Sequence, residues 1–265
     1  MEDILQIALK AVQNGQSCAF ATIVEATPKG TPRKSGAKMV VLSDGTTFGT
    51  IGGGRNEKAA QGECLKAISI GKPTYVTYNY FGKEGQSICG GQTKVFIEPF
   101  IGKKHLIICG AGHIALPLSA LGKILNFKVT IVDDRKNYAN KTRFPHVDGI
   151  FVGPHAKSLK KIKINENCFI TIVTQGNEYD YECLKVAIET NAAYIGVISS
   201  QAKRVKFFRR LKESGTASTE IQKVHAPMGL NIGAQTPEEI AISIMSEIIA
   251  KNTNSLGSTL RFQHS

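Results

Sequence analysis

The stretch that decides the fold runs from Leu106 to Asp134 and reads LIICGAGHIALPLSALGKILNFKVTIVDD. Its first residues, 106–109, form a short apolar run that is typical of a buried parallel strand. A glycine turn follows, then apolar residues at helical spacing over 114–125, then a second apolar run over 128–132. This order of strand, turn, helix and strand predicts the opening βαβ unit of a Rossmann fold.

The glycine turn of this unit has the composition of an anion-binding loop. Gly110 and Gly112 are the first two positions of a G-x-G-x-x-A pattern, and Ala115 is the small third position. Glycine lets the backbone approach a pyrophosphate, and the free N–H groups at the helix start point toward it. Asp133 and Asp134 end the second strand about twenty residues after the turn, where an acid can accept from a ribose hydroxyl. We therefore expect a nucleotide or phosphate here.

The composition indicates a globular chain with room for two domains. The chain has 265 residues, of which 42% are hydrophobic, and this length suits two domains that each bury a core. We place the boundary at the basic segment Gly102–Lys104. The expected parts are a small N-terminal α/β domain over 1–102, a Rossmann-like parallel-sheet domain over 103–251, and a polar tail over 252–265.

The charge and the apolar runs limit the classes of partner. The net charge is +12, from 33 basic and 21 acidic residues, which fits either solvated lysine-rich faces or an anionic ligand or acidic partner. We see no zinc finger, recognition helix or RNA-binding signature, so we expect no nucleic acid. We see no signal peptide, and no apolar run reaches the roughly 18 residues of a membrane helix. We therefore expect a cytoplasmic protein without a membrane partner.

The six cysteines lack the C-x-x-C spacing of a zinc site or a redox pair. Cys109 and Cys168 lie inside apolar runs and are expected to be buried. Cys89 differs, because Gly90 and Gly91 follow it directly. Glycines leave the sulfur accessible and supply N–H groups that stabilise a thiolate. Cys89 is either a small residue in a tight turn or a thiol that handles sulfur or a metal.

A second glycine run, Gly52–Gly54, precedes a helix predicted over 57–69. Three glycines between a strand and a helix make either a tight turn that packs the helix or a cradle for an anion or cofactor. Glu57 lies in the first helical turn, where its charge favours the helix dipole. Arg33 belongs to a Pro-, Gly- and Lys-rich loop that is either solvated or a clamp for phosphate or a partner.

The rest of the chain alternates helices and strands, which predicts an α/β fold. Further helices are expected over 3–13, 180–190, 203–212 and 237–251, the last with a capping box that begins at Thr236. Further strands are expected over 18–24, 39–42, 46–51, 74–80, 94–100, 148–152, 167–173 and 193–198.

Together these motifs resemble the xanthine dehydrogenase accessory protein family (XdhC/CoxI), the maturation factors of molybdenum hydroxylases. In the first domain the resemblance rests on TPRKSGAKM from Thr31, DGTTFGTIGGG from Asp44 and CGGQTKVFIEP from Cys89. In the second domain it rests on CGAGHIA from Cys109, VDDR, YIGVI and APMGLNIGAQTPEEIA. It covers nearly the whole chain, and the shared order of the motifs makes it specific.

The resemblance implies a non-catalytic chaperone. Members of the family are taken to bind molybdenum cofactor, protect it while a terminal sulfur is installed, and pass it to the apo-hydroxylase. The implied ligand is molybdopterin or its dinucleotide form, the implied partners are an apo molybdenum hydroxylase and a sulfur donor, and a homodimer is expected. In this interpretation Cys89 contacts the molybdenum or its sulfur, the glycine runs hold phosphate or nucleotide, and Arg33 and Arg55 supply charge.

The expected cofactor-binding residues are Arg33, Gly52, Gly53, Gly54, Arg55, Glu57, Cys89, Gly90, Gly91, Gly110, Gly112, His113, Asp133 and Gln175, with Cys89 also as the metal ligand. Three positions depart from the family. Arg55 stands where the family commonly has cysteine, Gln175 where it often has histidine, and Ser199–Gln201 where it has Gly-Ser-Arg. These departures concern the expected ligand site more than the fold.

Two other functions fit parts of the sequence. An NAD(P)-dependent oxidoreductase would use the Rossmann unit, but no catalytic acid–base pair accompanies His113 or His225. In that case Asp133 favours NAD, while the neighbouring Arg135 favours NADP. A docking or regulatory module without a ligand is the third alternative, and the departures at Arg55, Gln175 and Gln201 support it.

Overall fold

The computed structural model describes residues 4–80, 90–253, 255, 257 and 258. The chain divides into two compact units, Met1–Lys103 and Lys104–Ser265. Each unit has its own sheet and its own hydrophobic cores. The predicted fold class, a small N-terminal α/β domain followed by a Rossmann-like parallel-sheet domain, is confirmed.

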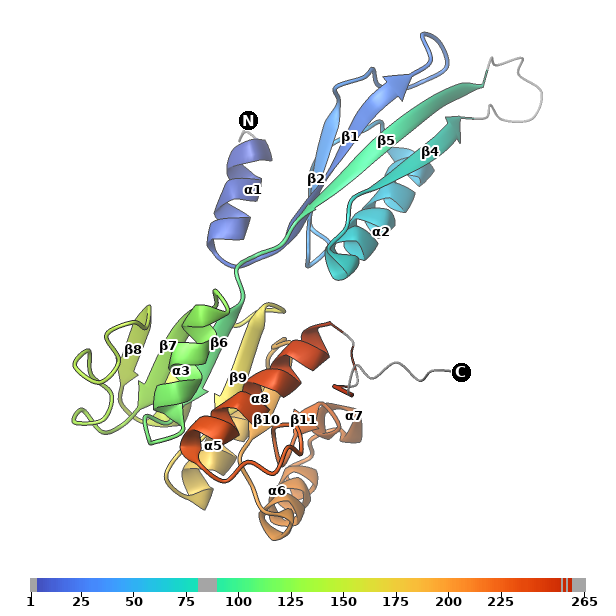
Figure 1. The fold of residues 1–265 in the computed structure, drawn as a ribbon. Coiled ribbons are helices and arrows are strands. Elements are labelled where there is room, and N and C mark those ends of the chain that lie inside the picture. Colours follow the sequence, from blue (N-terminus) through green and yellow to red (C-terminus); the bar gives the residue numbers. More distant parts are fainter. Residues whose placement is uncertain (1–3, 81–89, 254, 256, 259–265) are drawn as a thin grey trace, which may run out of the picture. The chain divides into compact units, whose positions relative to one another are not determined.

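The first unit is built on a five-stranded antiparallel sheet with the order β3-β2-β1-β5-β4 (Figure 1). Its strands are β1 (Cys18–Ala26), β2 (Lys38–Leu42), β3 (Thr47–Gly49), β4 (Thr74–Tyr80) and β5 (Gly91–Phe100), and its helices are α1 (Ile4–Gln13) and α2 (Gly54–Ile70). Helix α2 packs on one face of the sheet, and α1 packs against β1 and β2 on the other face.

The residue pattern explains this packing. Burial alternates along β5, so that Thr93, Val95 and Ile97 are completely buried under α2 while the residues between them are more exposed. This period of two is what a strand with a single covered face requires. Helix α2 ends at Gly71, which has the left-handed conformation that favours glycine at this position.

The second unit is a six-stranded parallel sheet with the order β11-β10-β9-β6-β7-β8. Its strands are β6 (His105–Cys109), β7 (Lys128–Asp133), β8 (Gly149–Val152), β9 (Cys168–Ile172), β10 (Tyr194–Val197) and β11 (Val224–His225). Its helices are α3 (Ala115–Ile124), α4 (His155–Leu159), α5 (Asn177–Ile188), α6 (Gln201–Glu213), α7 (Ser218–Ile221) and α8 (Pro237–Asn252). The strand order reverses between β6 and β9, where doubly wound sheets bind their ligands.

Helices cover both faces of this parallel sheet. Helices α3 and α8 pack side by side over one core, and α4, α5 and α6 lie over the other (Figure 1). All residues of β6 and β9 are buried, which explains their continuous apolar sequence. Cys109 and Cys168 are among them, as predicted. Among the described residues, no helix has both the length and the apolar character that crossing a membrane requires.

The predicted elements are present, with shifts at their ends. Helix α2 begins at Gly54 rather than at Glu57, and β5 begins at Gly91 rather than at Lys94. In both cases the element begins at a glycine, which the sequence pattern does not indicate. Three short elements, α4, α7 and β11, were not predicted, because two to five residues are too few for a periodic pattern.

We expect Gly110→Ala to destabilise the second unit. Gly110 has φ of +114°, and a Cβ there would lie 2.4 Å from the carbonyl oxygen of Val173. Strain and overlap together predict a loss of about 3 kcal/mol in the free energy of unfolding. Hydrogen-exchange mass spectrometry of the β6 and β9 amides measures this loss in the second unit alone.

Gly112→Ala is the matched control for Gly110→Ala. A Cβ at Gly112 meets no atom within 4 Å, so the expected change in stability is below about 0.5 kcal/mol. Equal protection of the amides in the Gly110→Ala protein and the parent would contradict the close packing of this turn.

Candidate functional site

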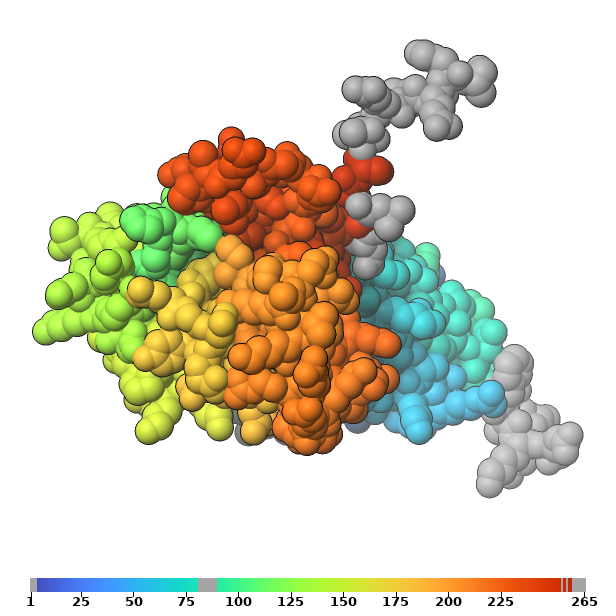
Figure 2. Space-filling view, turned by 90° about the horizontal axis from the view of Figure 1, so that it is seen from below, coloured from blue at the N-terminus to red at the C-terminus, as the bar shows by residue number. Residues whose placement is uncertain are grey.

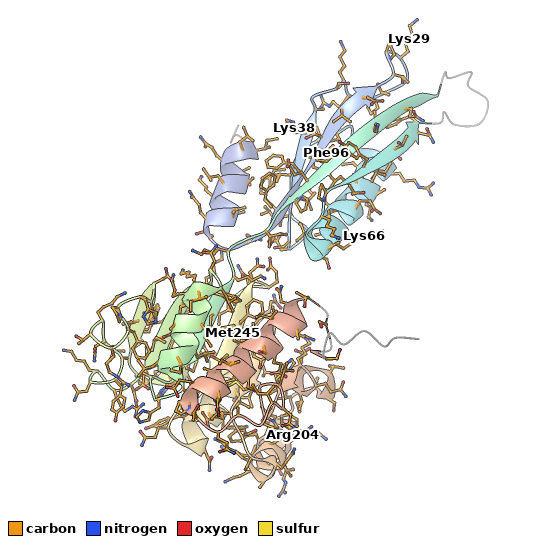
Figure 3. The ribbon with its side chains drawn as sticks, in the orientation of Figure 1. Lys29, Lys38, Lys66, Phe96, Arg204 and Met245 are labelled. Atoms are coloured by element: carbon orange, nitrogen blue, oxygen red, sulfur yellow. The ribbon has the colours of Figure 1, made fainter. Side chains whose placement is uncertain are left out.

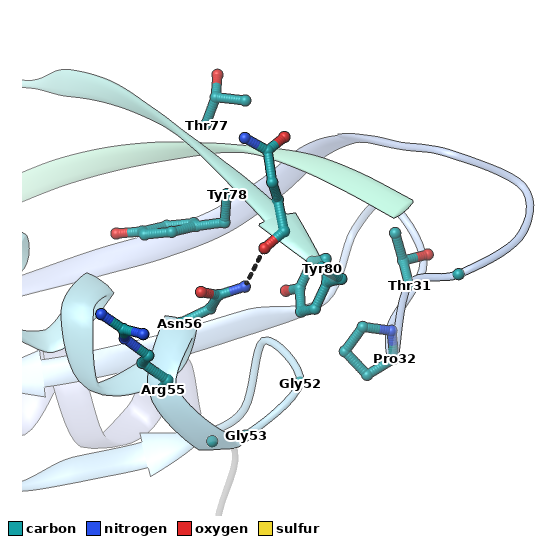
Figure 4. Close-up of a pocket in the computed structure, with 12 residues that line it drawn as sticks. Thr31, Pro32, Gly52, Gly53, Arg55, Asn56, Thr77, Tyr78 and Tyr80 are labelled. Atoms are coloured by element: carbon teal, nitrogen blue, oxygen red, sulfur yellow. Dashed lines mark hydrogen bonds between the residues drawn. The ribbon is translucent and has the colours of Figure 1, made fainter. Parts of the chain in front are cut away.

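The first unit contains a cavity of about 1000 Å³. Three segments line it: Gly30–Pro32 from the loop after β1, Gly52–Asn56 at the start of α2, and Thr77–Tyr80 at the end of β4 (Figure 4). The structure therefore brings the predicted Gly52–Gly54 run and Arg55 together in one concave site. A cavity of this size is large enough for a cofactor.

Glycines hold the walls of this cavity close to one another. A Cβ at Gly52 would lie 2.4 Å from Cγ of Pro32, and a Cβ at Gly91 would lie 2.2 Å from the carbonyl oxygen of Gly30. Any side chain at either glycine would push the β1–β2 loop away. The role of Gly52 and Gly91 is therefore to seat this loop against α2 and β5.

The Glu57 carboxylate closes the glycine loop from inside. Its Oε2 accepts hydrogen bonds from the hydroxyl of Thr50 at 2.5 Å and from the amides of Ile51 and Gly53 at 3.0 Å each. Burial opposes the ionisation of Glu57, but these hydrogen bonds prevail and hold its pKa below the usual value. The anion that binds the amides of this loop is thus the Glu57 carboxylate of the same chain.

The next residues along α2 are the ones that remain open to the cavity. No hydrogen bond from the amides of Gly54, Arg55 or Asn56 is found within the described residues, as expected for a first helical turn without a side-chain cap. Arg55 is exposed and lines the cavity. Figure 4 shows Asn56 donating to the carbonyl oxygen of Asn79, at 3.2 Å, which joins α2 to β4. This end of the cavity therefore offers N–H donors and one cation.

Other predicted residues of the first unit lie around this site. Arg33 is exposed in the loop that follows the lining residue Pro32. Lys29 lies at the tip of the same loop (Figure 3). Gly90 is exposed next to β5. Cys89, the predicted metal ligand, lies outside the described residues.

In the second unit, Asp133 binds the glycine turn rather than solvent. It is completely buried at the end of β7. Its Oδ2 accepts from the amide of Ala111 at 2.7 Å and from Nη2 of Arg135 at 2.8 Å. Its Oδ1 accepts from the amide and Nε of Arg135, each at 2.9 Å. Burial opposes ionisation, but these bonds hold the pKa of Asp133 far below its usual range.

Arg135 also links two strand ends across the turn. Its Nη1 donates to Oε1 of Gln175 at 2.5 Å, and Gln175 follows β9 while Arg135 follows β7. Since β6 lies between these strands, the bond passes the carboxyl end of β6, where the glycine turn begins. Gln175 is thus a neutral acceptor for a guanidinium that Asp133 already neutralises.

Two further residues lie beside this turn: Arg143, which no sequence motif indicated, and Asp134, the second acid at the end of the predicted strand. Arg143 donates from Nη1 to the carbonyl oxygen of Ala111 at 3.1 Å. Its guanidinium also lies 4.7 Å from the ring centre of Tyr138. Asp134 directly follows Asp133, and its side chain is 33% exposed. Arg143 could not be found from the sequence, because a loop brings it back to the turn.

The predicted residue His113 is exposed within the same turn. The end of β9 nearby is held by another buried acid. Asp180 accepts from the amide and the hydroxyl of Thr174, at 3.1 and 2.6 Å, and forms an ion pair with Lys203. It is completely buried in the first turn of α5. These bonds fix α5 and α6 against the strand ends, which is a structural role.

Comparison with known proteins identifies the family. Residues 106–248 match the XdhC Rossmann domain, and residues 11–79 match the XdhC and CoxI family. The first match alone covers more than half of the chain. The chain therefore belongs to the XdhC and CoxI family.

Individual relatives agree with this assignment. The chain is 34% identical over 250 residues to the uncharacterized protein YqeB of Escherichia coli K12, which covers 91% of this chain and 45% of YqeB. It is 31% identical over 157 residues to a probable xanthine dehydrogenase component of Bacillus subtilis 168, with coverages of 59% and 46%. The chain thus spans slightly less than half the length of these two relatives.

Two further similarities extend over nearly the whole chain. The molybdenum cofactor insertion chaperone PaoD of Escherichia coli K12 is 22% identical over 281 residues, with 92% of this chain and 86% of PaoD covered. The crystal structure of a xanthine dehydrogenase from Bacillus halodurans has a TM-score of 0.52 and 22% identity, with coverages of 97% and 98%. At this identity the structural similarity shows a shared fold alone.

We expect Glu57→Gln to destabilise the first unit in a pH-dependent manner. The pKa of Glu57 is lowered on folding, so its ionised form stabilises the protein above the unfolded-state pKa of about 4.3, and this contribution is lost as the pH falls through the folded-state pKa. The expected loss is about 1–2 kcal/mol at pH 7, because the ionised acceptor of two amides and a hydroxyl is gone. Hydrogen exchange of the β1 and α2 amides at several pH values measures it.

Glu63→Gln is the control on the same helix. Glu63 is partly exposed and pairs with Lys66 at 2.7 Å, so its loss should cost no more than about 0.5 kcal/mol. A difference between Glu57→Gln and the parent that grows on acidification would contradict the assigned role of Glu57.

Proposed function

We propose that this protein binds molybdenum cofactor and delivers it to an apo molybdenum hydroxylase. Membership of the XdhC and CoxI family and similarity to a molybdenum cofactor insertion chaperone support this function. The observation that carries it is the cavity of the first unit, which gathers Arg55 and the glycine run Gly52–Gly54 at one end. No catalytic residue is assigned, since delivery requires binding and protection rather than bond chemistry.

The chemistry of the cavity lining fits the anionic end of the cofactor. A terminal phosphate is held by N–H donors and a cation, and the start of α2 supplies both through the amides of Gly54–Asn56 and the Arg55 guanidinium. The Glu57 carboxylate turns toward its own loop, so its charge is screened by hydrogen bonds. Burial raises the pKa of Tyr78 to about 12, so its hydroxyl, which lies in the core behind the cavity wall, stays neutral.

Arg55, which departs from the family, changes which ligand groups this end of the cavity can bind. A cysteine there would be a soft ligand for molybdenum or its sulfur, whereas a guanidinium repels a metal cation and attracts phosphate. We therefore assign Arg55 to the phosphate end of the cofactor. The thiol that contacts the metal or its incoming sulfur is then Cys89, followed in sequence by Gly90 and Gly91.

The other parts of this proposal follow from the family. A sulfur donor and the apo-hydroxylase are the partners, the working form is a homodimer, and delivery takes place in the cytoplasm. The cofactor is molybdopterin or its dinucleotide form. Native mass spectrometry of freshly purified protein reports both the oligomer and the bound cofactor.

We expect Arg55→Glu to abolish most cofactor binding. The substitution replaces the cation at the open end of the cavity by an anion that repels phosphate, so retained cofactor should fall at least about tenfold. The measurement is co-purification with cofactor, followed by fluorescence of the oxidised pterin. Arg209→Glu is the matched control, since Arg209 is exposed on α6, a surface helix of the second unit (Figure 2). Equal loss in both variants would show a net-charge effect and refute the role of Arg55.

We expect Cys89→Ala and Cys89→Ser to lose bound cofactor or its terminal sulfur. Serine keeps the size and polarity of cysteine but is a hard ligand, so both variants should fail alike if the soft sulfur is what matters. Pterin fluorescence measures the cofactor, and cyanide-releasable sulfur measures the sulfuration. Full retention of both in either variant would remove Cys89 from the site.

A further inference from the structure

We propose that the Rossmann unit holds a second binding site, for a ribonucleotide whose diphosphate joins an unmodified ribose, and that Asp134 and Arg143 are its recognition residues. This site is separate from the cavity of the first unit and goes beyond cofactor delivery. It lies at the carboxyl ends of β6 and β7, next to the reversal of strand order between β6 and β9. Doubly wound sheets bind their ligands at this reversal.

Asp133 cannot act as the ribose acceptor that Rossmann folds usually have at this position. A carboxylate offers about four in-plane acceptor positions. All four are in use, by the Ala111 amide and by three donors of Arg135. The side chain is also completely buried. A ribose hydroxyl would have to displace these charge-assisted bonds and open the glycine turn.

Asp134 is the acid that remains available at this strand end. Its carboxylate lies close to that of Asp133, but the Asp134 side chain is 33% exposed while that of Asp133 is buried. Its carboxylate lies 4.0 Å from Nε of Arg135, too far for a hydrogen bond. Within the described part of the chain, no donor forms a hydrogen bond to the Asp134 carboxylate. It is therefore free to accept from a ribose diol.

Arg135 is not available to bind a ligand phosphate. Arg135 binds Asp133 through Nε and Nη2 and Gln175 through Nη1, so its charge is neutralised and its orientation fixed. It is therefore not the free guanidinium that a 2′-phosphate requires. A 2′-phosphate would instead meet the Asp134 carboxylate, which repels it.

Arg143 supplies the positive charge for the diphosphate. Its Nη1 donates to the carbonyl oxygens of Ala111 and Tyr138, at 3.1 and 3.4 Å, and its guanidinium lies over the rings of Tyr138 and Phe144. Among the described residues, no carboxylate forms an ion pair with it. Ala111 lies between the two glycines of the turn, so an uncompensated cation is held where the diphosphate of a dinucleotide belongs.

Arg143 and Asp134 match the two parts of one ligand. The positive charge lies beside the glycine turn and suits a diphosphate, and the negative charge lies at the end of β7 and suits a ribose diol. Nicotinamide adenine dinucleotide and the nucleotide half of a dinucleotide pterin cofactor share this chemistry. The site therefore selects a free ribose over a 2′-phosphorylated one, which NAD⁺ and NADP⁺ distinguish.

Isothermal titration calorimetry of the full chain tests the proposal, with NAD⁺, ADP, CDP, GDP and NADP⁺ as probes. We expect at least one diphosphate with a free ribose to bind, and NADP⁺ to bind at least about tenfold more weakly than NAD⁺ or ADP. Preference for NAD⁺ and ADP assigns the adenine dinucleotide class, and preference for CDP or GDP assigns the pterin dinucleotide class. Equal or tighter binding of NADP⁺, or no heat with any probe, overturns the proposal.

Two variants separate recognition from a structural role. Asp134→Asn should weaken the best diphosphate about tenfold and should not weaken NADP⁺, because the lost acceptor also repelled the phosphate. Arg143→Gln should weaken every diphosphate and reduce the dependence of binding on salt. Lys212→Gln, at an exposed cation of α6, should change neither the affinity for diphosphates nor the salt dependence of their binding. If the Asp134→Asn protein keeps the parent's preference for unmodified diphosphates over NADP⁺, Asp134 is not the ribose acceptor.

Pterin fluorescence keeps this proposal distinct from cofactor delivery. A chain that retains pterin cofactor but gives no heat with any nucleotide refutes the second site alone. A chain that binds diphosphates without retaining pterin cofactor supports the second site and refutes the proposed delivery function.

Discussion

Hydrogen bonds from backbone amides to a carboxylate of the same chain hold both glycine loops in place. In the first unit Glu57 accepts from Ile51 and Gly53, and in the second unit Asp133 accepts from Ala111. Bonds of this kind are charge-assisted and strengthen when water is excluded. Without them, adjacent loop amides would be left without partners, which costs about 1–3 kcal/mol for each buried group. The walls of both candidate sites depend on these bonds.

The same bonds decide which residues can meet a ligand. An amide that binds an internal carboxylate no longer binds an external anion, and a carboxylate surrounded by donors no longer accepts from a sugar. In the binding modes that we propose, contact with a ligand therefore moves to neighbouring residues. In the first unit these are the amides that follow Gly53 and the Arg55 guanidinium, and in the second unit they are Asp134 and Arg143. The glycine pattern thus locates each site, and its neighbours set the chemistry.

The sequence predicted the fold because the fold depends on local periodicity. The continuous apolar runs of β6 and β9 and the alternation along β5 have physical causes that act within a few residues. The site is predictable in part, since the glycine run Gly52–Gly54 and Arg55 do line one cavity. Whether Glu57 and Asp133 bind their own loops or a ligand is not predictable, because it depends on which amides approach each carboxylate in space. Arg143 lies outside every motif, since a loop returns it to the turn.

The two departures with a clear structural setting, Arg55 and Gln175, point in the same direction. Arg55 replaces a soft metal ligand by a hard cation that suits phosphate. Gln175 places a neutral oxygen beside Arg135, where a protonated histidine would repel the guanidinium and leave Asp133 to hold two cations. With glutamine, Arg135 donates to a neutral oxygen, and its charge is balanced by Asp133 at 2.8 Å and by Asp134 at 4.0 Å. Both departures therefore fit the anionic ligands that we propose for the two sites.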